Sequence, residues 1–104
     1  MSTSPTQRTL KEMRKRGYTC AITEHWNAFA HIRQDLFGIV DVLCLQGDET
    51  VAVQTTSDSN VSARVKKIAE HENTPMIRDA GWKIVVHGWR KVKGRWQVRE
   101  VDCS

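Results

Sequence analysis

The sequence predicts a single α/β domain, and three observations lead to that prediction. First, the chain has 104 residues, a length typical of one domain with one modest hydrophobic core. Second, 39% of the residues are hydrophobic and 27% are charged, which is a globular composition. Third, helix-like and strand-like patterns follow one another in the order α-β-β-β-α-(α)-β-β, without an internal repeat or a linker that would separate domains.

The N-terminal part of the chain is predicted to hold one helix and one short strand. Its first four or five residues are expected to be frayed. A helix fits residues 5–16, because Pro5 suits a first helical turn and Gly17 suits a helix end. Residues 18–22 have the composition of a short strand. Residues 25–38 mix aromatic, basic and acidic side chains without a clean period and are predicted to be irregular.

The centre of the chain contains the clearest strand pattern. Residues 39–45 are apolar except at Asp41 and are predicted to form a strand. A glycine-containing turn at 46–50 follows, and residues 51–56 are expected to return as the antiparallel partner of this strand. The two segments together predict a β-hairpin.

The C-terminal half is predicted to contain two helical segments and a second hairpin. Residues 60–71 are expected to form a helix that buries one apolar face. The residues of that face are Val61, Val65 and Ile68. A short helical segment is expected from Thr74 to Gly81, followed by a strand at 82–92 and its hairpin partner at 95–101.

Charge is distributed unevenly along the chain, although the net charge is only +4. Residues 1–16 carry five basic and one acidic residue, residues 17–59 one basic and six acidic, and residues 60–104 ten basic and five acidic. One interpretation is the ordinary solvated surface of a basic protein. The other is a group of carboxylates that holds a cation, set in a positive surface that attracts polyphosphate.

Cysteine usage and hydropathy exclude several protein classes. The three cysteines, Cys20, Cys44 and Cys103, form no CxxC pair and leave one over in any pairing, which indicates reduced thiols and a cytoplasmic location. Apolar runs fall short of the ~18 residues needed to cross a bilayer. The polar start of the chain is unlike a signal peptide. We therefore expect neither a secreted nor a membrane protein.

Asp41 is the most informative single residue because it interrupts a strongly apolar strand. A buried carboxylate is costly unless cations or hydrogen-bond donors meet it, and the alternative is an aspartate at a strand end that faces solvent or an arginine. Gln54 and Thr56 interrupt the next strand two residues apart, so they share one face of it. Antiparallel pairing would bring Asp41 near both, and the combined oxygen atoms are of the kind that Mg²⁺ prefers.

This pattern resembles a known nuclease superfamily. The sequence GIVD at 38–41, an apolar strand, a turn and VAVQTT at 51–56 ahead of a helix are similar to the PD-(D/E)XK motif. The likeness covers about residues 8–90, and segments 33–38 and 54–60 resemble small Holliday-junction-resolvase-like and restriction-like nucleases of bacteria and phages. It implies a restriction-endonuclease-like α-β-β-β-α-β core with a mixed sheet, to which the C-terminal hairpin adds an extra strand.

The resemblance implies a DNA endonuclease that uses Mg²⁺ or Mn²⁺ to hydrolyse phosphodiester bonds, in branched DNA among other forms. Asp41 matches the metal-binding aspartate, Gln54 the acidic residue of the (D/E)XK element and Thr56 its lysine. Glutamine keeps an oxygen ligand but loses a charge, whereas threonine lacks the cation that positions or activates the attacking water. The alternative is therefore an inactive nuclease-fold module that binds nucleic acid or a partner protein.

Other residues complete the predicted site. Glu24 is a candidate third carboxylate for catalysis and metal binding, with a surface glutamate beside His25 as the alternative. Asp35 either supports Asp41 or pairs with Arg33. Candidates for the missing lysine on the following helix are Arg64, Lys66 and Lys67, of which Lys66 is included in the catalytic set. The predicted nucleic-acid-binding residues are Arg33, Asn60, Arg64, Lys66 and Lys67. We expect a homodimer on DNA, because so short a chain must pair to cut both strands.

The C-terminal hairpin interleaves Trp82, Trp89 and Trp96 with lysines and arginines. Such aromatic rings can stack on unpaired bases while the cations meet phosphates. The alternative is that two of the tryptophans fill the core and the charges line an edge strand. We favour the core role for the tryptophans and the nucleic-acid role for the charges.

Overall fold

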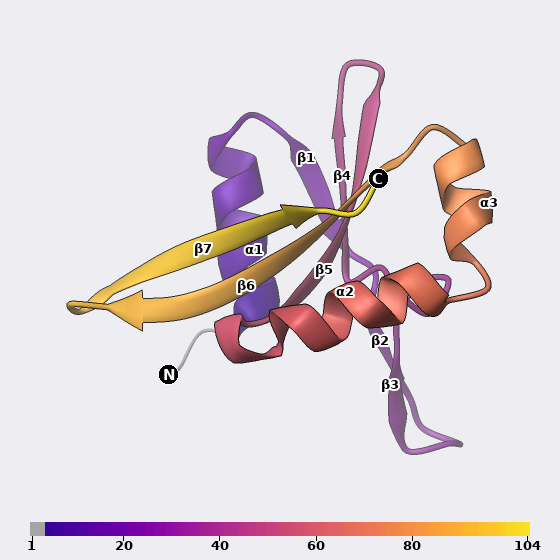
Figure 1. Ribbon diagram of the computed structural model, residues 1–104, viewed down its shortest axis with the longest axis horizontal. Coiled ribbons are helices and arrows are strands. Elements are labelled where there is room, and N and C mark those ends of the chain that lie inside the picture. The colour runs from indigo at the N-terminus through magenta and orange to yellow at the C-terminus, as the bar shows by residue number, and fades with distance from the viewer. Residues whose placement is uncertain (1–3) are drawn as a thin grey trace.

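The computed structural model describes residues 4–104 and confirms the α/β class with a mixed sheet. Five strands form that sheet in the order β1-β4-β5-β6-β7 (Figure 1). Strands β5 and β6 are parallel to each other, and the other three neighbouring pairs are antiparallel. The strands are β1 (Thr19–Ile22), β4 (Val42–Gln46), β5 (Glu49–Ser57), β6 (Lys83–Val92) and β7 (Arg95–Asp102).

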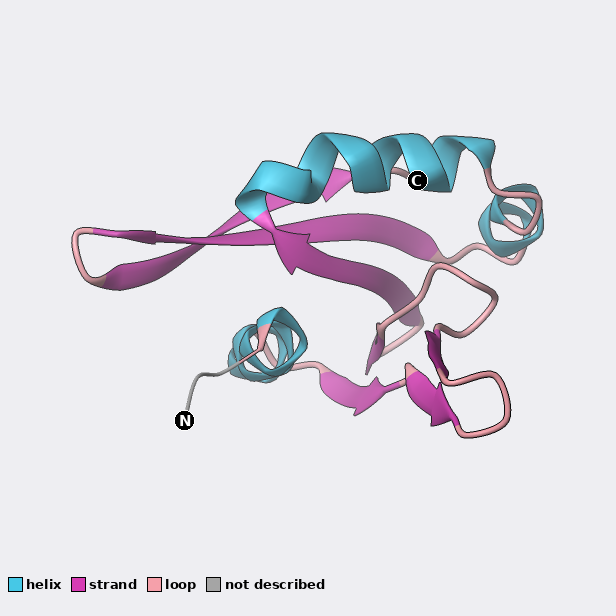
Figure 2. Cartoon of the chain, turned by 90° about the horizontal axis from the view of Figure 1, so that it is seen from below, coloured by secondary structure: helices cyan, strands magenta, loops and turns pink. Residues whose placement is uncertain are grey.

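Helices cover both faces of the sheet. Helix α1 (Pro5–Lys15) lies on one face and α2 (Val61–Glu70) on the other, as Figure 2 shows. A 3-10 turn (Asp58–Asn60) precedes α2, and α3 (Thr74–Asp79) follows it before β6. The predicted apolar face of α2 is confirmed, because two of its residues are buried and one is half-buried. No helix within residues 4–104 is long and apolar enough to cross a membrane.

Helix α1 begins at Pro5, as the sequence predicts, so residue 5 belongs to the helix and not to a frayed end. The Ser4 hydroxyl caps the helix by accepting a hydrogen bond from the backbone N–H of Gln7 at 3.2 Å, and this cap holds the first turn. The expected fraying of residues 1–3 lies outside the described residues. Gly17 follows the helix with a φ of +100°, a conformation that glycine adopts without strain.

The predicted hairpin of residues 39–45 and 51–56 is confirmed, with a later start for its first strand. Strand β4 begins at Val42, opposite Val53 of β5. The preceding residues form a tight loop in which Leu36 and Val40 exchange backbone hydrogen bonds of 3.0 Å each. The Asp41 N–H still donates to the Val53 carbonyl at 2.9 Å, so Asp41 is fixed beside β5 although it precedes β4.

The segment predicted to be irregular contains a second small sheet. Strands β2 (His25–Asn27) and β3 (Ile32–Gln34) pair antiparallel and project away from the main sheet (Figure 1). The prediction was wrong here because this hairpin exposes its large apolar side chains and therefore lacks the alternation of a half-buried strand. These exposed side chains are Trp26, Phe29 and Ile32.

Candidate metal centre

Three carboxylates converge where the small hairpin meets the main sheet. Glu24 immediately precedes β2, Asp35 immediately follows β3, and Asp41 immediately precedes β4. One oxygen from each carboxylate lies within 4.8 Å of those of the other two. Asp41 is 3% exposed, while Glu24 and Asp35 are half-buried. The cluster therefore has one buried member and two members that face a cleft.

Asp41 is buried and accepts hydrogen bonds from donors on β5. Its Oδ2 accepts hydrogen bonds from Gln54 Nε2 at 2.7 Å and from the backbone N–H of Thr55 at 2.8 Å. The Thr55 hydroxyl donates to the same oxygen at 3.3 Å. The predicted proximity of Asp41 and Gln54 is confirmed, and the solvent-facing alternative for Asp41 is excluded.

The protonation of Asp41 reflects its surroundings. Burial and then the neighbouring Asp35 carboxyl raise the pKa of Asp41 from 3.8 to about 7, although hydrogen bonds from Thr55 and Gln54 oppose this shift. Near neutral pH this carboxyl thus carries its proton for part of the time. A divalent cation among the three acids would favour the ionised form, because its charge offsets both the burial and the repulsion.

Two cations and one hydroxyl group contact the other two acids. The Arg33 guanidinium lies 3.1 Å from Glu24 Oε1, and Lys67 Nζ lies 3.8 Å from Asp35 Oδ2. The Thr6 hydroxyl donates to Glu24 Oε1 at 3.1 Å. Each of these side chains comes from a different element, so the cluster depends on the packing of α1, α2 and the small hairpin together.

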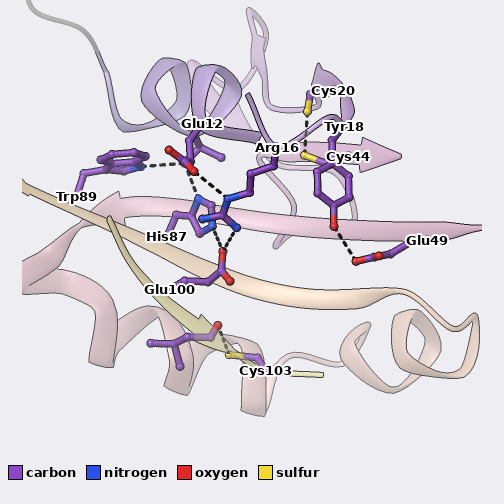
Figure 3. Close-up of polar contacts among 12 residues, drawn as sticks. Glu12, Arg16, Tyr18, Cys20, Cys44, Glu49, His87, Trp89, Glu100 and Cys103 are labelled. Atoms are coloured by element: carbon purple, nitrogen blue, oxygen red, sulfur yellow. Dashed lines mark hydrogen bonds and ion pairs between the residues drawn. The ribbon is translucent and has the colours of Figure 1, made fainter. Parts of the chain in front are cut away.

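A polar network, partly buried, anchors α1 on the sheet (Figure 3). Trp89 Nε1 donates to the Thr9 hydroxyl at 2.9 Å, and that hydroxyl lies 3.1 Å from His87 Nδ1. His87 Nε2 donates to Glu100 Oε2 at 2.6 Å, which leaves Nδ1 as the acceptor for Thr9 in a neutral imidazole. Burial lowers the pKa of His87 against the opposing effect of Glu100, which keeps the ring neutral. Arg16 completes the network with a 2.8 Å contact to Glu100.

The acidic cluster opens into a cleft of about 520 Å³. Four of the five predicted nucleic-acid-binding residues line it: Arg33, Asn60, Arg64 and Lys67. Arg64 and Lys67 are three residues apart and share one side of α2, and Asn60 immediately precedes this helix, four residues before Arg64. Lys66 lies off that side, is exposed and does not line the cleft. The helix spacing was the signal that distinguishes Lys67 from Lys66.

Gln54 and Thr56 take positions that differ from the expected ligand set. Gln54 presents its Nε2 to the acids, with Asp41 at 2.7 Å and Asp35 at 3.4 Å, while its Oε1 is buried without a hydrogen-bond partner among the described residues. To bind a cation through Oε1, this amide must turn over. Thr56 lines the cleft, but the hydroxyl that contacts Asp41 belongs to Thr55. Sequence reasoning missed Thr55 and treated Asp35 only as a supporting acid.

The three carboxylates fit a hard divalent cation. Mg²⁺ and Mn²⁺ prefer oxygen ligands, and two oxygens on opposite sides of Mg²⁺ are at most about 4.2 Å apart. The three carboxylate oxygens lie within 4.8 Å of one another, so they must move closer together to bind one ion. Glu24, Asp35 and Asp41 are therefore the residues that would hold the ion.

Comparisons with known proteins do not indicate a family for this chain. No model of a protein family matches the sequence, and no curated protein matches it. The likeness to PD-(D/E)XK nucleases therefore remains a prediction that depends on the order of the elements and on the residues of the cleft.

Proposed function

We propose that the protein is a divalent-metal-dependent DNA endonuclease that hydrolyses phosphodiester bonds at the acidic cleft. The observation that supports this most is the meeting of two kinds of group in one cleft. Three carboxylates lie together at its base, and Arg64 and Lys67 line its wall. The acids suit a metal ion, and the cations suit the phosphates of a nucleic acid.

In such a reaction the acids of the cleft would bind the metal ion and its cations would bind the phosphate. Mg²⁺ or Mn²⁺ held by Glu24, Asp35 and Asp41 would polarise the scissile phosphate and lower the pKa of a water molecule. Arg64 and Lys67 bind phosphate oxygens and orient the backbone. In this role Lys67 also offsets the negative charge that develops on the phosphate, as the motif lysine of the superfamily would.

The position of Lys67 gives a direct test of this assignment. Lys67→Ala should reduce the cleavage rate by at least tenfold, since loss of one electrostatic contact to a transition state commonly costs 10²-fold or more. Lys66→Ala is the matched control, because the adjacent lysine has the same charge and is exposed outside the cleft. Equal effects of the two substitutions would remove the catalytic role from Lys67.

The experiment for the function itself is a cleavage assay on supercoiled, single-stranded and branched DNA with Mg²⁺, Mn²⁺ or EDTA. We expect cleavage with either metal and none with EDTA. Asp41→Asn should abolish cleavage while binding is kept or tightened, because one negative charge facing phosphate has gone. Absence of metal-dependent cleavage on every DNA form would end the endonuclease proposal.

A second candidate function is a nuclease-fold module that binds nucleic acid without cutting it. The side chains at the (D/E)XK positions favour it, since Gln54 carries no charge and Thr56 supplies no cation. This module would bind DNA in EDTA with the steep salt dependence of counterion release. It would show no cleavage, and Asp41→Asn would leave its affinity unchanged.

Pairing of two copies and a reducing location complete the proposal. Trp26, Phe29 and Ile32 present an exposed apolar surface on the β2–β3 hairpin, and we assign this surface to a homodimer. The three cysteines are free thiols in the structure, in keeping with the expected cytoplasmic compartment.

A further inference from the structure

A second groove lies between α1 and the β6–β7 hairpin, separate from the acidic cleft. Its volume is about 330 Å³. Arg8, Lys11 and Lys15 line it from α1, and Trp89 and Trp96 line it from the two strands. We name it the α1 groove. Its three cations lie outside the nucleic-acid-binding set that the sequence predicts, and for its two tryptophans base stacking was the less favoured of two interpretations.

The α1 groove carries unbalanced positive charge. Within residues 4–104, Arg8, Lys11 and Lys15 form no ion pair. Glu12 is the acidic residue that lines the groove, and it is paired with Arg16 at 2.8 Å. Lys11 and Lys15 are also one helical turn apart on an exposed helix side, so they form a row of cations.

The two tryptophans of the groove differ in their roles. Trp89 is 7% exposed and donates its indole N–H to Thr9, which makes it part of the core. Trp96 is 46% exposed, and the Arg8 guanidinium carbon lies 3.5 Å from the centre of its ring. Trp96 thus presents a large aromatic surface at the groove, already arranged to stack with a planar cation.

We propose that the α1 groove binds single-stranded DNA, with phosphates on Arg8, Lys11 and Lys15 and an unpaired base stacked at Trp96. Cations that follow the backbone and an aromatic ring that receives a base are the two components of single-strand binding sites. A duplex satisfies only the first of them, because its bases are already stacked and paired.

The same helix turn borders the acidic cleft. Pro5 and Thr6 line the cleft, whereas Gln7 and Arg8 line the α1 groove. Pro5 and Arg8 are separated by about 5 Å along the helix axis. A DNA strand that crosses the first turn of α1 therefore contacts both the α1 groove and the acidic cleft. This placement rests on the proposed nuclease function and names its substrate class, which is DNA with a single-stranded segment.

The test measures binding in EDTA, where cleavage does not occur, by the fluorescence anisotropy of a labelled fifteen-residue oligothymidine. Trp96→Ala should weaken binding about tenfold, and Trp96→Phe should keep most of the affinity, because stacking on one base contributes this much. Lys11→Gln and Lys15→Gln should each reduce the slope of log K against log salt by about 0.7. Lys66→Gln on α2, across the sheet, is the charge-matched control and should change the affinity less than either.

Two further probes separate stacking from charge alone. Affinity for inorganic polyphosphate should be unchanged by Trp96→Ala, and affinity for a fifteen-base-pair duplex should change less than twofold. Equal losses on oligothymidine and polyphosphate, or no loss on oligothymidine with a folded Trp96→Ala variant, would overturn the proposal. So would a Lys66→Gln effect as large as those of the α1 lysines. If Trp96-dependent binding occurs without metal-dependent cleavage of any DNA, the α1 groove stands and the endonuclease proposal fails.

Discussion

Replacement of Asp41 by asparagine should stabilise the metal-free protein. The substitution keeps the size of the side chain and an oxygen that accepts the hydrogen bonds from Gln54 and the Thr55 backbone. It removes a charge that is 3% exposed and lies beside Asp35. A buried charge next to a like charge opposes folding, so its removal raises the free energy of unfolding.

The pKa of Asp41 sets the size and the pH dependence of this effect. A raised pKa means that the folded state holds the proton more tightly than the unfolded chain, so stability is lost as pH rises from about 4 through about 7. A shift from 3.8 to about 7 corresponds to about 4 kcal/mol at pH 8. At pH 5 the same shift gives about 2 kcal/mol, since only the unfolded chain has then lost its proton.

Urea unfolding in EDTA at pH 5 and pH 8 measures this difference between variant and wild type. The difference cancels the contributions of titrating groups that do not interact with residue 41. The control is Asp48→Asn, an exposed aspartate in the β4–β5 turn, which should change stability by less than about 0.5 kcal/mol. Addition of Mg²⁺ or Mn²⁺ at pH 8 should stabilise the wild type, by about 2.7 kcal/mol at 100 times the Kd, and leave Asp41→Asn unchanged.

Two results would refute this reasoning. The first is an Asp41→Asn variant that is less stable than the wild type at pH 8 in EDTA, which would show that the ionised carboxylate contributes to folding. The second is a stability difference that is the same at pH 5 and pH 8, which would show that the pKa of Asp41 is ordinary.

Four further predictions follow from other contacts. Gln54→Glu places a fourth carboxylate beside Asp41 and Asp35, so it should lower the free energy of unfolding in EDTA by about 1–3 kcal/mol and enlarge the stabilisation by Mg²⁺. A variant as stable as the wild type would contradict the repulsion between these carboxylates. The pKa of His87 is lowered in the fold, so stability should fall as pH drops below about 6.5, where the unfolded chain takes up the proton first. In urea unfolding, the stability of His87→Gln should decrease less over this pH range than that of the wild type. Gly88→Ala would bring a Cβ into collision with Val61 and to 3.1 Å from Asp58 Cα, and thermal unfolding should show a loss of about 1–3 kcal/mol, whereas Gly47→Ala, which has open space, should lose about 1 kcal/mol from its positive φ alone. Phe29→Ser should shift the protein from dimer to monomer in sedimentation experiments, and an unchanged dimer would place the interface elsewhere.

The proximity of Asp41 and Gln54 was predictable because each residue is a polar exception in an apolar strand. The short turn between the strands then fixes which residues lie opposite one another. The helix that lines the cleft was also predictable, since its buried residues recur with helical spacing.

Other parts of the site were not predictable from the sequence. Asp35 reaches the cluster through the β2–β3 hairpin, which has no buried face and thus no hydrophobic period to reveal it. Thr6 reaches Glu24 because the core packing of α1 places it there, and packing between distant elements leaves no local pattern. The amide orientation of Gln54 depends on Asp35 and Asp41 together, so it follows only from the assembled site.

The β2–β3 hairpin connects the acidic cluster to an exposed loop at the surface. Glu24 and Asp35 flank the two ends of this hairpin, while the Phe29 side chain in its loop is 100% exposed. The paired strands, with Trp26 opposite Arg33, connect this loop to the two acids. A fluorophore attached at residue 29 should therefore report whether an ion draws Glu24 and Asp35 together.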